Sequence, residues 1–337
     1  MRENIKRLLI CTIFIGLFIS SSFGENRKLA QTGMKFLSVS VDARFSALSG
    51  ANAALEGAST SLLYNPAGMA NMSGFANVAL GQVNWIADIR YLFGSTSFSF
   101  ADGRYGIFGL SFVSIDYGDF QGTVRADNEQ GFLDTGIFSP TAFAVGFGYA
   151  KSLSLKFSVG GQVKYVFQDL QGGIVSFNAD ETAQTESFEM NVVAFDFGIQ
   201  YKTGFESLKF GMSVRNFARE LKYIEESFQL PLTFKLGLSI DLIDFTTVNP
   251  DIHSLLVAVD ASHPRDYTEQ VDFGLEYLFL KTFALRFGYT FPADEQGFSL
   301  GAGVNQEIGN FGFRLDYAYT SFGIFDDIHR FTIQFAL

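Results

Sequence analysis

The chain contains one match to a catalytic motif, the G-x-S-x-G pattern of serine esterases at Gly297-Phe298-Ser299-Leu300-Gly301. In those enzymes a sharp turn between a strand and a helix exposes the serine hydroxyl as a nucleophile. Here the motif lies in a run of alternating residues that continues to Val304, which predicts a strand and no such turn. We therefore interpret the glycines as relieving crowding inside a barrel, and we predict no catalytic residue and no enzyme activity.

The residues that could bind a metal are dispersed. His253, His263 and His329 lie far apart without H-x-x-x-H spacing, whereas a zinc site needs converging ligands. The acidic stretches Asp116–Asp134 and Asp180–Glu189 could bind Ca²⁺ weakly or simply form solvated loops. Neither contains a twelve-residue EF-type loop. We favour solvated loops, and we predict no metal site and no cofactor.

A group of charged residues lies on the Gly- and Ser-rich face of the last segments of the chain. It comprises Asp272, Glu276, Arg286, Arg314, Asp316 and Arg330. Opposite charges inside a barrel can pair across strands and hold an internal segment in place. One hypothesis is that Arg286 and Arg314 hold the turn at Asn65–Gly68 by hydrogen bonds. The alternative is a structural ladder of charges without a gating role.

These charges belong to segments in which every second residue is large and apolar, the period of a strand with two different faces. In Thr282–Phe291, for example, Phe283 and Leu285 take one face while Ala284 and Arg286 take the other. The segments are about ten residues long, as tilted strands that cross a bilayer require. The 40 Phe residues would supply the lipid-facing surface of such a wall.

The chain has about fourteen alternating segments, an even number as in bacterial barrels. Because every backbone polar group needs an internal partner in a bilayer, the sheet must close. The predicted fold is all-β: a transmembrane outer-membrane β-barrel of about 14 antiparallel strands with an N-terminal helical plug. The segments are 75–83, 89–100, 104–116, 141–151, 153–168, 188–202, 206–217, 230–243, 254–262, 268–279, 282–291, 296–306, 310–321 and 328–337.

The connections between segments alternate between tight turns and longer loops, typical of periplasmic turns and outer loops. The longer ones are 117–140, 169–187, 218–229 and 322–327, and 244–253 is longer than the scheme predicts. Alternation blurs at Phe108–Phe112, where we expect a bulge. Four aromatic residues near segment ends either form girdles at the membrane surface or simply pack: Trp85, Tyr117, Tyr149 and Tyr267.

The first 24 residues have the features of a cleaved secretory signal peptide: basic residues, the apolar run Leu8–Ile19, and small residues before Glu25. A membrane anchor is the alternative. The sole cysteine, Cys11, lies in this segment, so we expect no disulfide in the mature protein. Residues 25–337 contain 21 basic against 34 acidic residues, a net charge of −13. Phosphate contacts need clustered basic residues, so this balance argues against nucleic-acid binding.

Residues 25–74 do not alternate, and we expect them to form a plug segment inside the barrel of residues 75–337. Val39–Leu63 is rich in Ala, Ser, Leu and Gly, which predicts a helix with small residues, followed by a turn at Asn65-Pro66. Side chains alone do not fill a barrel of about fourteen strands, so an internal plug is expected.

The chain resembles the PorV/PorQ family, relatives of the FadL-type outer-membrane transporters. The resemblance rests on Phe36-Leu37, Asp42-Ala43-Arg44, Ser49-Gly50-Ala51, Tyr64-Asn65-Pro66-Ala67-Gly68, Val271–Tyr277, Leu285–Tyr289 and Gly297–Gly303. It implies a fourteen-stranded barrel in the bacterial outer membrane. It also implies a plug motif comprising Arg44, Gly50, Asn65, Pro66, Ala67 and Gly68. The last strand, which runs to Leu337, resembles the C-terminal targeting strand of outer-membrane proteins.

Two functions follow from this resemblance. Some family members serve type IX secretion, which implies outer-membrane lipid, a secretion translocon and the C-terminal domains of secreted cargo as partners. FadL-like relatives pass hydrophobic small molecules, which implies a lipophilic ligand in an apolar pocket between plug and wall. We favour the secretion role by analogy with the family and keep the channel as the alternative.

Overall fold

The computed structural model of the chain describes residues 32–177, 183–222, 226–293, 296–309 and 311–337. The predicted signal peptide and the first residues of the predicted plug segment lie outside these ranges. Among the described residues, no helix is long and apolar enough to cross a bilayer.

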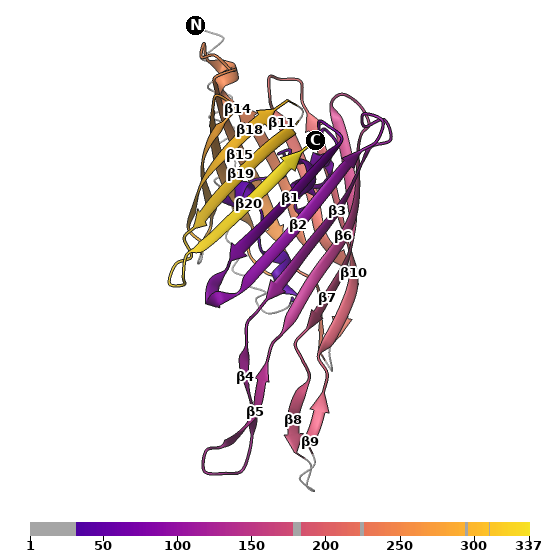
Figure 1. The fold of residues 1–337 in the computed structure, drawn as a ribbon, viewed down its shortest axis with the longest axis vertical. Helices are drawn as coiled ribbons and strands as arrows, with labels where there is room; N and C mark the ends of the chain where they lie inside the picture. The colour runs from indigo at the N-terminus through magenta and orange to yellow at the C-terminus, as the bar shows by residue number, and fades with distance from the viewer. Residues whose placement is uncertain (1–31, 178–182, 223–225, 294–295, 310) are drawn as a thin grey trace.

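Fourteen antiparallel strands form a closed barrel, which confirms the predicted fold (Figure 1). The last strand pairs with the first, so the sheet has no free edge. The strands are β1 (Ala76–Asn84), β2 (Arg90–Ser99), β3 (Ile107–Asp116), β6 (Thr141–Ser152), β7 (Phe157–Asp169), β10 (Glu189–Lys202), β11 (Lys209–Ala218), β14 (Thr233–Asp241), β15 (His253–Pro264), β16 (Gln270–Phe279), β17 (Phe283–Phe291), β18 (Phe298–Ile308), β19 (Phe311–Thr320) and β20 (Ile328–Ala336).

Alternation along each strand separates an apolar outer surface from a small and polar inner one. On β17 Phe283 and Leu285 are more than half exposed, whereas Ala284 and Arg286 are buried. The bulge expected at Phe108–Phe112 was wrong, because β3 keeps one continuous register with both neighbours. Its alternation looked blurred because apolar residues at both of its ends face inward against the plug. The barrel register shifts instead between β10 and β11.

Short connections gather at one end of the barrel, here called the turn end, and the long ones at the other, the loop end. The four long loops predicted from the sequence all lie at the loop end. The connection 244–253, which includes the end of η5 (Leu242–Phe245), lies at the turn end. By the usual asymmetry of such barrels, the turn end faces the periplasm and the loop end the exterior.

Three loops at the loop end form two-stranded hairpins: β4 (Phe120–Arg125) with β5 (Phe132–Phe138), β8 (Gly173–Phe177) with β9 (Ala183–Glu186), and β12 (Leu221–Lys222) with β13 (Ser227–Phe228). The first two project well beyond the barrel (Figure 1).

The aromatic residues near strand ends do not form a uniform girdle. Trp85 packs against Tyr91 and Phe322, with ring centroids 6.1 and 5.3 Å apart. Tyr149 is exposed on the outer surface near the turn end. Packing therefore explains Trp85, and a place at the membrane surface suits Tyr149.

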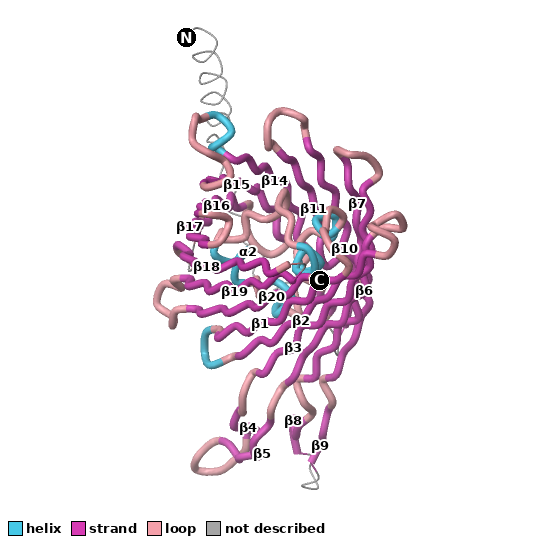
Figure 2. Tube along the Cα trace, turned by 45° about the horizontal axis from the view of Figure 1, so that its top comes forward, coloured by secondary structure: helices cyan, strands magenta, loops and turns pink. Residues whose placement is uncertain are grey.

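The described part of the plug segment, residues 32–74, runs through the barrel from the loop end to the turn end, mostly as loops and short helical turns (Figure 2). The single helix predicted over 39–63 was wrong. The segment contains α2 (Ala43–Ala47) and three short 3₁₀ helices: η1 (Lys35–Ser38), η2 (Ala58–Leu63) and η3 (Pro66–Met69). The helix ends early because Ser49 and Gly50 have positive φ values, 51° and 84°.

Candidate functional site inside the barrel

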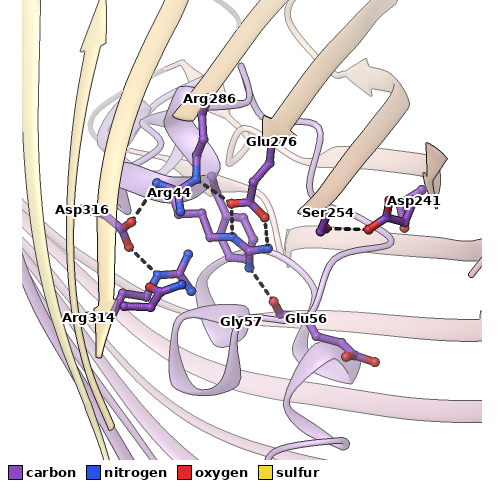
Figure 3. Close-up of polar contacts among 12 residues, drawn as sticks. Arg44, Glu56, Gly57, Asp241, Ser254, Glu276, Arg286, Arg314 and Asp316 are labelled. Atoms are coloured by element: carbon purple, nitrogen blue, oxygen red, sulfur yellow. Dashed lines mark hydrogen bonds and ion pairs between the residues drawn. The ribbon is translucent and has the colours of Figure 1, made fainter. Parts of the chain in front are cut away.

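Arg44 of α2 is the main ionic contact between plug and barrel (Figure 3). Its Nε and Nη2 donate to the two carboxylate oxygens of Glu276 on β16, at 2.8 and 2.7 Å. Its Nη1 donates to the Glu56 carbonyl at 2.7 Å, which ties α2 to the next stretch of the plug. Asp42 caps α2 by accepting from the Phe45 N–H at 2.9 Å, so the helix that carries Arg44 begins at a fixed residue.

The contact extends into a network of three arginines and two carboxylates. Arg286 on β17 donates to Glu276 at 2.5 Å and to Asp316 on β19 at 2.7 Å. Arg314, also on β19, forms an ion pair with Asp316 across 2.7 Å. The side chains of Arg286, Glu276 and Asp316 are at most 2% exposed, so removing one partner would leave a buried charge unpaired. The network therefore fixes where Arg44 and its helix lie.

The loop that follows α2 is held by a second set of polar contacts. Lys235 on β14 donates to the Gly50 carbonyl at 2.8 Å and pairs with Asp272 on β16 at 2.7 Å. Asp260 on β15 accepts from the backbone N–H groups of residues 52–53, both at 2.8 Å. Gly50 has φ +84°, a conformation that favours glycine. Lys235 and Asp260 were not among the predicted site residues, although alternation places Lys235 on the inner face.

Asn65 fixes the turn at the far side of the plug. Its side-chain amide donates to the carbonyls of Ala53 at 2.6 Å and Ile199 at 3.1 Å, and its Oδ1 accepts from the Ala67 N–H. It therefore joins two parts of the plug to β10. Pro66 follows at the first position of η3, where a missing N–H is tolerated.

Arg286 and Arg314 do not lie at this turn, contrary to the hypothesis drawn from the sequence. Their hydrogen bonds and ion pairs go to Glu276 and Asp316. The turn at Asn65–Gly68 packs instead against β7 and β10, where glycines leave room for the plug backbone. A Cβ on Gly160 would lie 2.5 Å from the Ala67 nitrogen.

Arg330 on β20 contacts the plug near the loop end. Its Nε donates to the Ser40 carbonyl and its Nη1 to Thr320 Oγ1, both at 2.8 Å. The guanidinium lies over the Trp85 ring, 5.6 Å from the centroid. These neutral partners hold the start of the plug against the last strand.

Two cavities between plug and wall are lined by described residues. The one beside Tyr64 and Phe36 holds only 40 Å³. The other, of 540 Å³, lies at the turn end between the plug and strands β18–β20, and it is lined by Asn305, Arg314 and Gln334 among other polar residues. Ligand sites usually measure roughly 300–1,000 Å³, so of these two cavities the second has the volume of a small-molecule site.

The residues with catalytic or metal-binding patterns serve local packing. Ser299 is on β18 and hydrogen-bonds Thr320 at 3.0 Å, so the G-x-S-x-G match lies on a strand as predicted. A Cβ on Gly301 would clash with Ala47 of the plug, so this glycine does relieve crowding. Within the described ranges each histidine side chain makes one hydrogen bond or ion pair: His253 with Tyr277, His329 with Tyr317, and His263 with Glu269.

The two acidic stretches differ in how far the structure describes them. Asp116 pairs with Arg90 at 2.6 Å, which explains one carboxylate of the first stretch without a metal. Asp180, at the start of the second, lies outside the described residues.

A closed fourteen-stranded barrel with a lipid-facing apolar surface and a filled lumen defines an outer-membrane β-barrel protein, and the protein is located in the bacterial outer membrane. Residues 133–335 match the family of type IX secretion system membrane proteins PorP/SprF. The chain belongs to this family, whose barrels serve secretion and are not enzymes. The sequence resemblance to PorV/PorQ proteins agrees at the level of type IX secretion, and a PorV/PorQ role itself stays a prediction.

Solved structures share the fold at low sequence identity. The Pseudomonas putida toluene transporter TodX is 11% identical, with a TM-score of 0.55 over 85% of this chain and 94% of that one. A Pseudomonas aeruginosa FadL homologue is also 11% identical, with a TM-score of 0.54 over 88% of this chain and 97% of that one. No curated protein sequence matches this chain. At this identity the likeness supports the FadL-like fold alone.

Proposed function

We propose that this protein serves type IX secretion by binding other proteins at its loop end, as in the PorV/PorQ role, and not by passing solutes through its lumen. The observation that carries the proposal is the β4–β5 hairpin, which displays apolar side chains outside the barrel. Phe120, Phe132, Leu133 and Ile137 are 46%, 43%, 43% and 72% exposed.

The hairpin lies beyond the level at which the barrel wall ends. The Arg90–Asp116 ion pair joins the first residue of β2 to the last residue of β3 at the loop end of the wall, and β4 begins four residues after Asp116. Its six residues add roughly 20 Å at about 3.3 Å each. Apolar side chains at this distance from the wall face water, and such exposed patches commonly mark protein-binding surfaces.

The hairpin is also acidic. Residues 116–139 carry five carboxylates and one arginine. We therefore expect the partner surface to combine apolar groups with Lys and Arg, since complementary charge speeds association and selects the partner. The C-terminal domain of a secreted protein is the partner class that the family implies.

The competing function is a channel for hydrophobic small molecules, the activity in the name of the toluene transporter. The size of the apolar cavity argues against it, because 40 Å³ beside Tyr64 is far below the volume of a ligand site. The larger cavity is lined mainly by amide, hydroxyl and charged side chains, which suit a polar ligand.

The test removes the apolar surface without shortening the hairpin. A variant with Phe120, Phe132, Leu133 and Ile137 all changed to Ser would be the sole copy in a bacterium that uses type IX secretion. Because a few buried apolar residues dominate most interfaces, we expect export of cargo to fall roughly tenfold or more. The readout is cargo on the cell surface by immunoblot, normalised to the barrel in the outer membrane.

The matched control makes the same chemical change at the other end of the barrel. Leu153 and Leu155, 61% and 97% exposed in the turn between β6 and β7, are changed to Ser. Export should then stay at the wild-type level. Unchanged export in the hairpin variant, with toluene crossing proteoliposomes that hold the protein, would favour the channel.

A further inference from the structure

The 540 Å³ cavity at the turn end has no assigned role. It lies at the opposite end of the barrel from the β4–β5 hairpin, so binding there and secretion through the loop end can fail separately. On the plug side its lining includes Glu56, Asn71 and Ser73; on the wall side it includes residues of β18, β19 and β20. It opens on the side that faces the periplasm.

Three polar residues lie side by side on neighbouring strands in the wall of this cavity. Asn305 of β18 is directly opposite Arg314 of β19, which is directly opposite Gln334 of β20. In the next row toward the turn end, Gly312 and Ala336 are small and leave the space into which the first row faces. The register thus places a guanidinium between two carboxamides at the floor of a cavity.

Arg314 is held in place by Asp316 and still has unused hydrogen-bond donors. Its Nε faces Asp316 at 2.7 Å, and among the described residues neither Nη atom makes a hydrogen bond. Its side chain is 20% exposed, so the guanidinium is accessible from the cavity. Asn305 Oδ1 is buried and likewise has no hydrogen-bond partner among the described residues. Unmade hydrogen bonds at buried polar groups are costly, which favours a ligand that completes them.

The arginine network behind Arg314 also places several guanidinium groups close to the floor of the cavity. Arg44, Arg286 and Arg314 share the two carboxylates of Glu276 and Asp316. The Nη2 atom of Arg286 is buried without a hydrogen bond. Glu56 and Glu307 in the lining disfavour a multiply charged anion such as phosphate, so a single carboxylate fits better.

We propose that this cavity binds a carboxylate carried by an extended peptide segment that enters from the periplasmic side. Arg314 receives the carboxylate, in the two-point geometry that guanidinium groups favour. The amides of Asn305 and Gln334, together with Asn71 on the plug, exchange hydrogen bonds with the peptide N–H and C=O groups. The carboxylate is either the C-terminus of the segment or an acidic side chain within it.

The test measures binding of defined peptides to the full chain purified in detergent. Three probes carry an uncharged BODIPY dye at the N-terminus: Gly-Ala-Ser-Gly-Ala with a free C-terminus, the same peptide amidated, and an amidated Gly-Ala-Glu-Gly-Ala. Fluorescence anisotropy should show saturable binding of the first or the third and none of the second. Binding of the first assigns the C-terminus, and binding of the third assigns the side chain.

Arg314→Gln should raise the Kd of the bound probe at least roughly tenfold, because the site loses its charge-assisted bonds. Arg90→Gln is the matched control: it removes an exposed arginine at the loop end and should leave the Kd unchanged. Should Arg314→Gln fail to fold, Thr282→Trp at the mouth of the cavity supplies an independent test, since the ring would block entry. Equal affinity for all three probes, affinity that neither variant alters, or no saturable binding of any probe would overturn the proposal.

Discussion

The two halves of the barrel wall hold the plug by different means. Strands β14–β20 contact it through charged groups, above all Glu276, Lys235 and Asp260. Strands β1–β7, across the barrel, contact it through neutral amides and hydroxyls and through glycines that admit its backbone, as at Asn77 and Gly160. One side of the plug is thus positioned by charge and the other by shape.

The difference shows how a wide barrel can fix an irregular segment that has little secondary structure of its own. Charges in a poorly solvated lumen tolerate few arrangements, because an unpaired one is costly, so they select the orientation of the plug. Close backbone packing then tolerates few shapes, so it excludes water and solutes from the rest of the lumen. Removing a charge from the charged side of the wall and adding a methyl group to a glycine on the neutral side should therefore disturb the plug from opposite sides.

The largest effect is expected for Glu276→Gln, which removes the shared partner of Arg44 and Arg286. Breaking a buried ion pair on one side costs about 3–5 kcal/mol, because the other charge stays buried. The measurement is unfolding in urea with the protein in detergent, followed by the fluorescence of Trp85, the only tryptophan of the chain.

A double variant tests whether the contact is direct. Arg44→Met combined with Glu276→Gln should lose less stability than the sum of the two single changes, since the first change has already removed one of the two ion pairs that the second would break. Strict additivity would show that Arg44 and Glu276 act independently, against the distances of 2.7 and 2.8 Å between them.

A smaller effect is expected on the neutral side, from Gly160→Ala. The new Cβ would lie 2.5 Å from plug backbone atoms of Pro66 and Ala67, which must move. Overpacking of this kind costs about 1–3 kcal/mol. The same unfolding assay measures it, with Gly173→Ala in the exposed β8 strand as the control, where no heavy atom lies within 4 Å. A control change beyond about 0.5 kcal/mol would show that strand glycines matter for another reason.

The smallest effect is expected for Glu56→Gln at the turn end. Burial raises the pKa of Glu56. The nearby Lys209 at 3.3 Å and Lys202 at 3.5 Å lower it by more than burial raises it, so the pKa lies below the usual 4.5. A carboxyl group with a lowered pKa stabilises the folded state above pH 4.5, and that contribution is lost as the pH falls through the lowered value.

The wild type should therefore exceed the Glu56→Gln variant by up to about 1 kcal/mol at neutral pH. The difference should vanish at acidic pH, which unfolding curves at a series of pH values would measure. A difference that persists at low pH would mean that Glu56 acts through packing and not through its charge.

The barrel could be predicted because the two faces of its wall lie in different environments, which imposes an alternating sequence pattern. Lipid outside and a packed polar lumen inside require alternation at every spanning strand, as on β17, so all fourteen segments were found. The plug could not be predicted in the same detail. Ala and Leu in Val39–Leu63 favour a helix locally, yet the chain turns at Ser49 and Gly50 because Lys235 and Asp260 bind the backbone there.

The sequence predicted which residues belong to the candidate site better than it predicted which of them contact one another. Alternation places Glu276, Arg286 and Asp316 on the inner face, and these residues do meet. The partner of Arg44 depends on where the plug lies within the finished barrel, which no local pattern encodes. Lys164 with Asp196 shows the same limit, since both face inward and pair at 2.8 Å without having been singled out.

The contact between Arg44 and Glu276 has a consequence for assembly, because these residues are 232 positions apart in the chain. Contacts of such long range form slowly, since a large loop must close before they contribute. The plug is synthesised before the wall, but its strongest anchor exists only once β16 and β17 are in place. Docking of the plug is therefore a late step of folding, and an immature barrel lacking its last strands would have an unsealed lumen.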